Sequence, residues 1–411
     1  MPRPADPRPQ ALLVAAFDSQ LKWVAGIRDE LVARGFDCPV VVPDVRSALS
    51  PAQIAAAGFT GVESVGWPEL LDRAALSSVV VCGLSGPFTL RFTVDLADRV
   101  GDGPGPVVVT GWVGVIIEKI TAGYLDRVGS DVVAVNGVDD LEHFVTVAQQ
   151  LDLDPGNLLL SGLPILGSSA AAPHGGPIRR VLFADQPTVP GPAQERLHLY
   201  RRLLDYAYAH PEREVLLKPR HRLGEDTFHR MVHHPEDLLL GVDRPPNFLI
   251  DYTPISELLP SVDLLLTMSS TAALEAVGSG CRVGLVLDLG VHERYGNHVF
   301  LASGLLRTFD QLIADDIGTP DRFWLGGYFF DRPGTATEQI ADRVETLLAS
   351  GERPSRRIWA SAYFRSASAY LRSTPVPAAP VPAGRSRLVR DLVPPVALRA
   401  GRRLRRRLAR R

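Results

Sequence analysis

Cysteine, lysine and long apolar runs are all scarce in this chain of 411 residues. The three cysteines are far apart and odd in number, which indicates neither a disulfide framework nor a zinc site and fits a reducing compartment. The longest apolar run, residues 107–117, is too short to cross a bilayer, and the polar residues 1–10 lack the apolar core of a secretory signal. We therefore expect a cytoplasmic protein without a signal peptide or a membrane-spanning helix.

Lysine supplies only three of the 44 basic residues, so most of the positive charge comes from arginine. The net charge of −2 hides an uneven distribution, because residues 385–411 contain eleven arginines and a single acid, Asp391. This basic tail can lie on an anionic membrane surface as an amphipathic helix, or it can be solvated and unstructured. The acidic remainder of the chain and the lack of aromatic residues in the tail argue against a nucleic-acid partner.

Strand-like apolar runs alternate with helical patterns along two stretches of the chain. In the first stretch, a run at residues 11–17 is followed by a helical pattern and by a second strand-like run at 36–42. In the second stretch, the same alternation starts again at residue 179. This order is typical of parallel sheets that are covered by helices on both faces. We therefore expect an α/β protein with two Rossmann-like domains.

The composition changes where the two stretches meet and again after the last helical pattern. A segment rich in glycine, proline, serine and alanine indicates an interdomain linker, and a proline-rich segment indicates an extended spacer. The expected organisation is a disordered N-terminus at 1–10, a first domain at 11–165, a linker at 166–177, a second domain at 178–372, a spacer at 373–384 and an arginine-rich tail at 385–411.

The most informative segment spans residues 263–280, where a buried strand ends at Ser269, Ser270 and Thr271 before a short helix that contains Glu275. Hydroxyl groups and free backbone N–H groups at such a helix start can hold a phosphate or simply cap the helix. Glu275 follows Thr271 by about one turn, where its carboxylate can accept hydrogen bonds from the vicinal hydroxyls of a ribose. The segment predicts a nucleotide site, with an ordinary capped helix as the alternative.

Basic residues gather directly after another strand-like run, at Lys218, Arg220, His221 and Arg222. Because α/β domains bind ligands at the carboxyl ends of their strands, these cations can neutralise the phosphates of a nucleotide. The alternative is a solvated loop that pairs with nearby acids. Asp185 also follows a strand-like run, and it either contacts the same ligand or caps a turn.

These motifs resemble a known family. Residues 263–283, preceded by an aspartate-tyrosine strand and a short helix, resemble the donor-binding segment of GT-B glycosyltransferases, particularly the sialyl-, polysialyl- and capsule-polymer transferases. Residues 218–222 are similar to the Lys/His-Pro loop of those enzymes, and residues 296–306 share in the likeness. Residues 162–164 are similar to the Gly-x-Pro step of related glycerophosphotransferases. In architecture, the whole chain resembles uncharacterised actinobacterial glycosyltransferases.

The resemblance implies a GT-B architecture, with a cleft between two Rossmann-like domains and a nucleotide-sugar donor bound by the second domain. His221 is then a catalytic candidate that assists departure of the phosphate. Two histidines in the loop at 292–298 lack a third ligand, so we assign His298 to sugar or phosphate contacts and expect no metal. The predicted donor-binding residues are Lys218, Arg220, Ser269, Ser270, Thr271, Glu275, Asp185 and His298.

The acceptor is expected to bind loops that follow the strands of the first domain. Asp18 follows the first strand and is the candidate catalytic base, with a helix N-cap as the alternative role. Trp112 offers a flat face to a sugar ring or packs into the core. The predicted acceptor-binding residues are Ser85, Gly86, Gly111 and Trp112.

The sequence thus predicts a metal-independent glycosyltransferase without a cofactor, in which the nucleotide-sugar is a substrate and the acceptor is a cell-surface glycan or a lipid-linked glycan. An inverting reaction is favoured, because Glu275 lacks the second glutamate that follows at eight residues in the common retaining signature. Peripheral binding at the inner face of the plasma membrane through residues 385–411 is also expected. The alternatives are a nucleotide-sugar epimerase, a glycerophosphotransferase, or a catalytically silent sugar-nucleotide-binding protein on the same scaffold.

Overall fold

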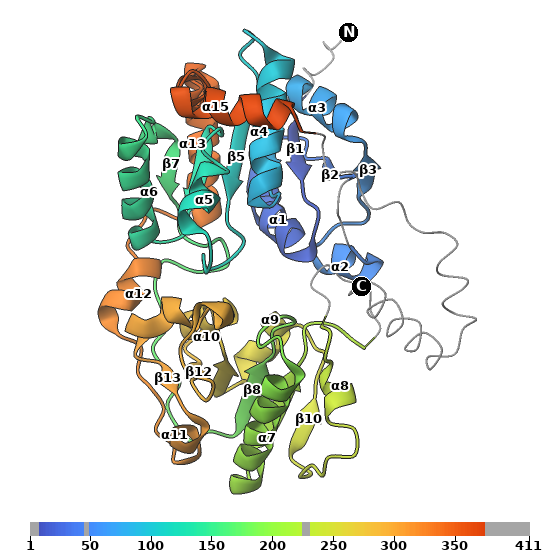
Figure 1. Cartoon of the computed structure of the whole chain (residues 1–411), viewed down its shortest axis with the longest axis vertical. Coiled ribbons are helices and arrows are strands. Elements are labelled where there is room, and N and C mark those ends of the chain that lie inside the picture. Colours follow the sequence, from blue (N-terminus) through green and yellow to red (C-terminus); the bar gives the residue numbers. More distant parts are fainter. Residues whose placement is uncertain (1–7, 45–48, 224–230, 375–411) are drawn as a thin grey trace, which may run out of the picture.

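The computed structural model describes residues 8–44, 49–223 and 231–374, which form two α/β domains (Figure 1). The basic tail and nearly all of the proline-rich spacer lie outside the described residues, as do residues 1–7.

The first domain contains a sheet of seven parallel strands in the order β3-β2-β1-β4-β5-β6-β7. Its central strands are rich in valine and buried along their whole length, because helices cover both faces of the sheet. The strands are β1 (Ala11–Val14), β2 (Val40–Pro43), β3 (Glu63–Val65), β4 (Val79–Cys82), β5 (Val107–Gly111), β6 (Val132–Val135) and β7 (Leu158–Leu160). The helices between them are α1 (Asp18–Ala33), α2 (Pro51–Ala56), α3 (Trp67–Leu76), α4 (Gly86–Val100), α5 (Ile120–Leu125) and α6 (Val138–Gln150).

The second domain contains a sheet of six parallel strands in the order β10-β9-β8-β11-β12-β13. Its strands are β8 (Arg180–Ala184), β9 (Glu214–Lys218), β10 (Phe248–Ile250), β11 (Leu264–Thr267), β12 (Arg282–Val286) and β13 (Leu306–Arg307). Its helices are α7 (Ala193–Ala209), α8 (Pro235–Leu238), α9 (Ile255–Leu258), α10 (Ala272–Gly278), α11 (Phe309–Ile313) and α12 (Arg322–Tyr328). The two sheets confirm the predicted α/β class with two Rossmann-like domains.

The last helices return to the first domain. Helix α13 (Ala336–Ser350) packs against α1, and Val344 is fully buried in the core beneath β5 and β6. Helices α14 (Pro354–Trp359) and α15 (Ala362–Arg372) continue on the same domain, and Figure 1 shows α15 lying across it. The prediction that residues 178–372 form the second domain is therefore wrong from α13 onward, because an amphipathic helical pattern does not indicate which sheet the helix will cover.

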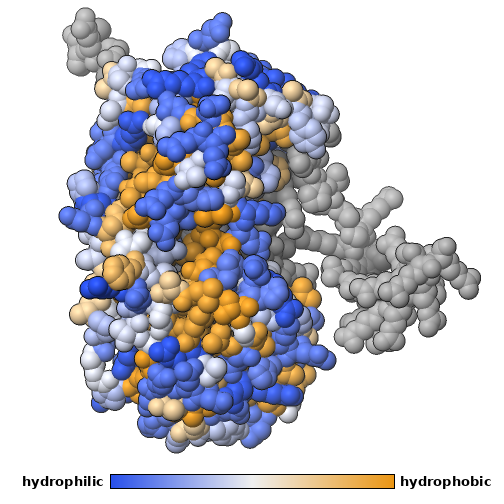
Figure 2. Space-filling view, turned by 60° about the vertical axis from the view of Figure 1, so that its left-hand side comes forward, coloured by the Kyte–Doolittle hydropathy of each residue, from blue (hydrophilic) through white to orange (hydrophobic). Residues whose placement is uncertain are grey.

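The two domains also pack against each other along one side, through α6 and α12. A Cβ atom on Gly137, at the start of α6, would come within 2.9 Å of the carbonyl oxygen of Gly327 in α12, so the backbones approach closely here. Figure 2 turns this side toward the viewer and shows apolar side chains in a band that runs over both domains. Phe323 in α12 is an apolar residue with 75% exposure.

Candidate functional site

The carboxyl ends of the two sheets meet at the junction between the domains. Arg220, which follows β9, donates a hydrogen bond to the carboxylate of Asp18, which follows β1, with 2.7 Å between Nη2 and Oδ2. The backbone N–H of Val115, after β5, donates to the hydroxyl of Thr271, after β11, at 3.1 Å. Since ligands of open α/β sheets bind at the carboxyl ends of the strands, both domains place their ligand edges at one site.

Asp18 is the first residue of α1, and its side chain is 13% exposed. The helix N-cap is Phe17, whose side chain makes no capping bond, so the alternative of Asp18 as the N-cap residue is not what the structure shows. Burial alone would raise the pKa of Asp18, but the charge and hydrogen bond of Arg220, together with the charge of Lys22, hold that pKa below its usual value. Asp18 is therefore an ionised carboxylate beside two cations.

Arg220 and Lys22 act on this carboxylate, and a third cation, Lys218, lies close to both of them. Lys22 lies one helical turn after Asp18, and its charge acts on Asp18, Lys218 and Glu275. Its side chain is exposed, and no hydrogen bond or ion pair engages it within the residues that the structure describes. The sequence prediction missed Lys22, although its spacing of four residues from Asp18 places both on one helix face.

Lys218 ends β9 and is half-buried. Burial, together with the charges of Arg220 and Lys22, lowers the pKa of Lys218 to about 8, and the charge of Asp251 partly opposes that shift. Three positive charges that lie close together attract an anion that binds among them. The charges at the junction therefore favour a phosphate ligand.

Glu275 lies in α10 and faces the same cluster. Burial raises the pKa of Glu275, and the charges of Lys22 and Arg220 oppose that shift. Within the described part of the chain its carboxylate has no hydrogen-bond or ion-pair partner, so both oxygens can accept hydrogen bonds from a ligand. This geometry is compatible with the predicted contact to ribose hydroxyls.

The three hydroxyl residues before α10 have different environments. Ser269 is 1% exposed, and its hydroxyl donates to the carbonyl oxygen of Tyr295 at 2.5 Å, while its backbone N–H donates to the side chain of Gln186. Ser269 thus links its own loop to the loops that contain Gln186 and Tyr295, and its hydroxyl is not free to bind a ligand. The hydroxyl of Ser270 accepts from the N–H of Ala272 and remains partly exposed, whereas that of Thr271 is engaged by the first domain.

Asp185 lies in a buried charged cluster, away from solvent. Its side chain is 2% exposed, pairs with Arg196 at 2.7 Å and accepts a hydrogen bond from the hydroxyl of Tyr200 at 2.5 Å. Arg196 also donates to the carbonyl oxygens of residues 186, 187 and 190, so it orders the loop after β8. These contacts engage both carboxylate oxygens with internal partners, and the donor contact of Asp185 stays a prediction.

His221 is also engaged in internal contacts. Its Nε2 accepts from the N–H of Met231 at 3.0 Å, so Nδ1 carries the proton and donates to the carbonyl oxygen of Arg222 at 2.9 Å. The ring is 5% exposed. Both ring nitrogens are occupied by backbone groups, so His221 orders its loop, and its catalytic role stays a prediction. His298 is half-buried, and its Nδ1 is buried without a partner among the described residues.

The predicted acceptor residues do not form one cluster of free groups. Trp112 is stacked on Phe144 with 5.0 Å between ring centroids, and the guanidinium of Arg127 lies over its ring at 4.4 Å. The packed alternative for Trp112 is therefore favoured. Gly111 is buried, and a Cβ atom there would lie 2.7 Å from the ring of Trp23. Ser85 and Gly86 begin α4, where a side chain on Gly86 would overlap the carboxylate of Asp126.

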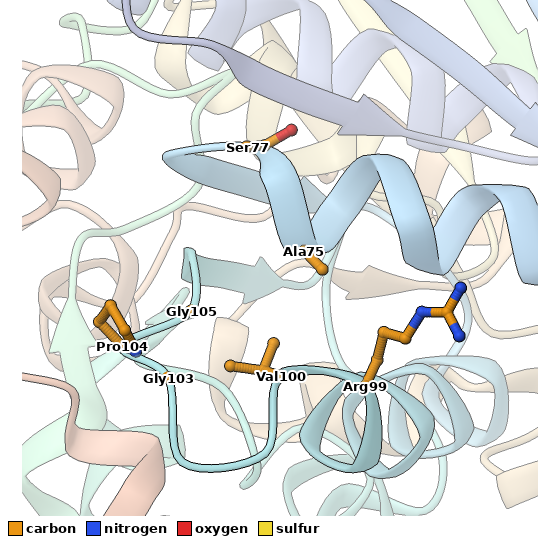
Figure 3. A pocket seen from close by; sticks show the side chains of 7 residues that line it. All are labelled: Ala75, Ser77, Arg99, Val100, Gly103, Pro104 and Gly105. Carbon is orange, nitrogen blue, oxygen red and sulfur yellow. The ribbon is translucent and has the colours of Figure 1, made fainter.

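Two cavities lie elsewhere in the fold. One, of about 370 Å³, is lined by residues that include Ser77 and Gly105 (Figure 3), which precede β4 and β5. The other, of about 350 Å³, includes Arg282 at the start of β12. Both are at the amino ends of strands, so neither belongs to the charged site at the carboxyl ends.

The described residues contain no cluster of three or more potential metal ligands. In the same part of the chain, no helix has the length and apolar character needed to cross a membrane.

Two Rossmann-like domains whose ligand edges face each other define the GT-B class, and solved structures share this architecture. A putative UDP-N-acetylglucosamine 2-epimerase from Listeria monocytogenes has a TM-score of 0.56 and 12% identity, covering 85% of this chain and 99% of its own. Arabidopsis thaliana UGT89C1 complexed with UDP has a TM-score of 0.53 and 11% identity, with coverage of 84% and 100%. The S. aureus MnaA–UDP structure has a TM-score of 0.53 and 12% identity, with coverage of 83% and 97%.

At the level of sequence, no curated protein matches the chain. The chain belongs to the family described as "Putative glycosyltransferase (DUF6716)", whose model matches residues 11–347. The match spans both domains and the start of the returning C-terminal helices.

Proposed function

We propose that the protein is a metal-independent glycosyltransferase that moves a sugar from a UDP-linked donor to an acceptor hydroxyl. The family supports a glycosyltransferase, and UDP is the nucleotide in two of the structures that share the fold. The observation that supports the proposal most strongly is the convergence of Lys22, Lys218 and Arg220 beside Asp18 and Glu275, where both sheets end.

The second domain holds the donor in this proposal. Lys218 and Arg220 bind its phosphates, Ser270 adds a hydroxyl contact, and Glu275 accepts hydrogen bonds from the ribose. These cations replace a metal ion in stabilising the charge that develops on the departing phosphate. Lys22 adds a third positive charge, from the first domain.

The first domain supplies Asp18 as the general base. Its carboxylate takes the proton of the acceptor hydroxyl while the acceptor oxygen forms a bond to the anomeric carbon. The bond between that carbon and the phosphate oxygen breaks, and its electron pair leaves with UDP. Attack from the face opposite the phosphate inverts the anomeric centre. We further propose a cell-surface or lipid-linked glycan as acceptor, with residues 385–411 bringing the protein to an anionic membrane.

Nucleotide binding tests the proposal directly. UDP is expected to raise the melting temperature of the wild-type protein more than CMP, GDP or CDP does, because a ligand that binds only the folded state stabilises that state.

Glu275→Gln is expected to weaken UDP binding about ten- to hundredfold in calorimetry, because charge-assisted hydrogen bonds are lost. Glu142→Gln, in the exposed part of α6, is the matched control and should bind UDP normally. If none of the nucleotides binds, the proposed function fails.

An epimerase is the second candidate, because two of the epimerase structures superpose on more than 80% of the chain with TM-scores above 0.5. Incubation with UDP-N-acetylglucosamine and no acceptor separates the two functions. In this incubation an epimerase produces the 2-epimer with the nucleotide still attached, whereas a transferase produces no 2-epimer.

The pH dependence of UDP affinity should report on Lys218. Its pKa of about 8 means that the ammonium is charged below pH 8 and neutral above it. A bound phosphate favours the charged form, so we expect affinity to be constant from pH 6.5 to 7.5 and to fall about tenfold per unit well above pH 8. Calorimetry at pH 7 and 9 measures the change. In Lys218→Arg the charge is permanent, and a decline of the same size in that variant would contradict the assignment.

A further inference from the structure

One ion pair joins the proposed donor side and the proposed acceptor side of the site. Arg220 belongs to the second domain and Asp18 to the first, and their bond at 2.7 Å crosses the junction. Under the proposed function, these are the residue that binds the donor phosphate and the residue that takes the acceptor proton. While they are paired, neither is free for its own task.

We propose that Arg220 exchanges partners during the reaction. Before the donor binds, Arg220 is paired with Asp18. When the donor binds, Arg220 pairs with the donor phosphate instead, and Asp18 is free to act as the base. This inference rests on the proposed function and adds an order to it, since the donor must bind before the acceptor can be deprotonated. Arg220 is thus a shared residue, and the acceptor base becomes active only when a sugar is present to be transferred.

The exposure of the two partners permits this exchange. The side chain of Arg220 is 41% exposed, whereas that of Asp18 is 13% exposed, so the guanidinium is the mobile partner. A nucleotide diphosphate carries more negative charge than a carboxylate and offers the geometry for a two-point contact with a guanidinium. Lys218 and Lys22 already supply positive charge nearby, and they favour the phosphate further.

The loss of Arg220 changes the chemistry of Asp18. Burial raises the pKa of Asp18, and it is mainly the charge and hydrogen bond of Arg220 that keep the pKa below its usual value. When the phosphate takes the guanidinium, Lys22 remains as the cation near the carboxylate. The pKa of Asp18 then rises, and a carboxylate with a higher pKa accepts the acceptor proton more readily at neutral pH.

Competition between Asp18 and the donor phosphate for Arg220 should change the affinity for UDP. Because wild-type protein must break the ion pair to bind UDP, Asp18→Asn is expected to bind UDP about two- to fivefold more tightly, a range typical of partly exposed ion pairs. Calorimetry with UDP and with inorganic pyrophosphate, which lacks the base and ribose, measures the effect on the phosphate contact alone.

A double-mutant cycle separates competition from simple charge repulsion between Asp18 and the phosphate. In the background Arg220→Met, Asp18→Asn should no longer change UDP affinity, because the shared residue is gone. Thermal melting of each free variant verifies that it folds, which we expect because Arg220 is partly exposed and the Asp18 change is isosteric. Tightening that persists in the Arg220→Met background, or no tightening in Asp18→Asn, overturns the exchange while leaving the proposed function intact. Failure of wild-type protein to bind UDP removes both.

Discussion

Asp18→Asn is expected to lower the kcat of sugar transfer about 10²- to 10⁴-fold, the usual contribution of a positioned general base. The amide keeps the size of the side chain but cannot take the proton of the acceptor hydroxyl. Release of UDP from the donor in the presence of acceptor measures kcat. The same variant should bind UDP at least as tightly as wild-type protein, so the defect should appear in turnover and not in donor affinity.

Asp29→Asn is the matched control for this prediction. Asp29 lies in the same helix, and its side chain is 68% exposed and pairs with Arg28 at the surface. Its removal should change kcat by less than about twofold, because exposed ion pairs contribute little to the structure around them. Equal losses in the two variants, or a loss below tenfold in Asp18→Asn, would show that another group takes the proton.

The sequence predicted the sheets and one half of the site because these depend on local patterns. Buried runs such as residues 79–82 and 264–267 are short, apolar and followed by turn residues, and parallel strands place their carboxyl ends on one edge. Lys218, Arg220 and Glu275 follow from that rule, and the structure brings all three near one another. Their roles toward a donor stay predictions until binding is measured.

The remaining features depend on contacts between distant segments, which local patterns do not contain. The Asp18–Arg220 pair joins residues 202 positions apart, and α13 covers a sheet that begins more than 300 residues earlier. His221 and Asp185 fit the sequence pattern of ligand-binding residues because a polar residue after a strand is the same in sequence whether it faces a ligand or an internal partner. Only the positions of Met231 and Arg196 distinguish the two cases.

Asp185→Asn is expected to reduce the free energy of unfolding by about 3–5 kcal/mol, because it leaves the charge of Arg196 buried without a counterion. Arg196 is 1% exposed and cannot reach water to recover its solvation. Urea unfolding followed by circular dichroism measures the loss. Asp205→Asn, whose side chain lies in the exposed part of the same helix α7 as Arg196, is the control and should cost less than about 1 kcal/mol.

The partner variant Arg196→Met tests the same pair from the other side and adds a pH dependence. Without Arg196, burial raises the pKa of Asp185 further, so the folded protein binds a proton more readily than the unfolded chain does. The destabilisation relative to wild-type protein should therefore be largest above neutral pH and should shrink as the pH falls toward 5.

A donor contact of Asp185 would behave differently: its loss would lower UDP affinity without a pH-dependent loss of stability. If Asp185→Asn weakens UDP binding strongly while its unfolding curve is unchanged, the carboxylate faces the ligand, and the predicted donor role of Asp185 is the correct one.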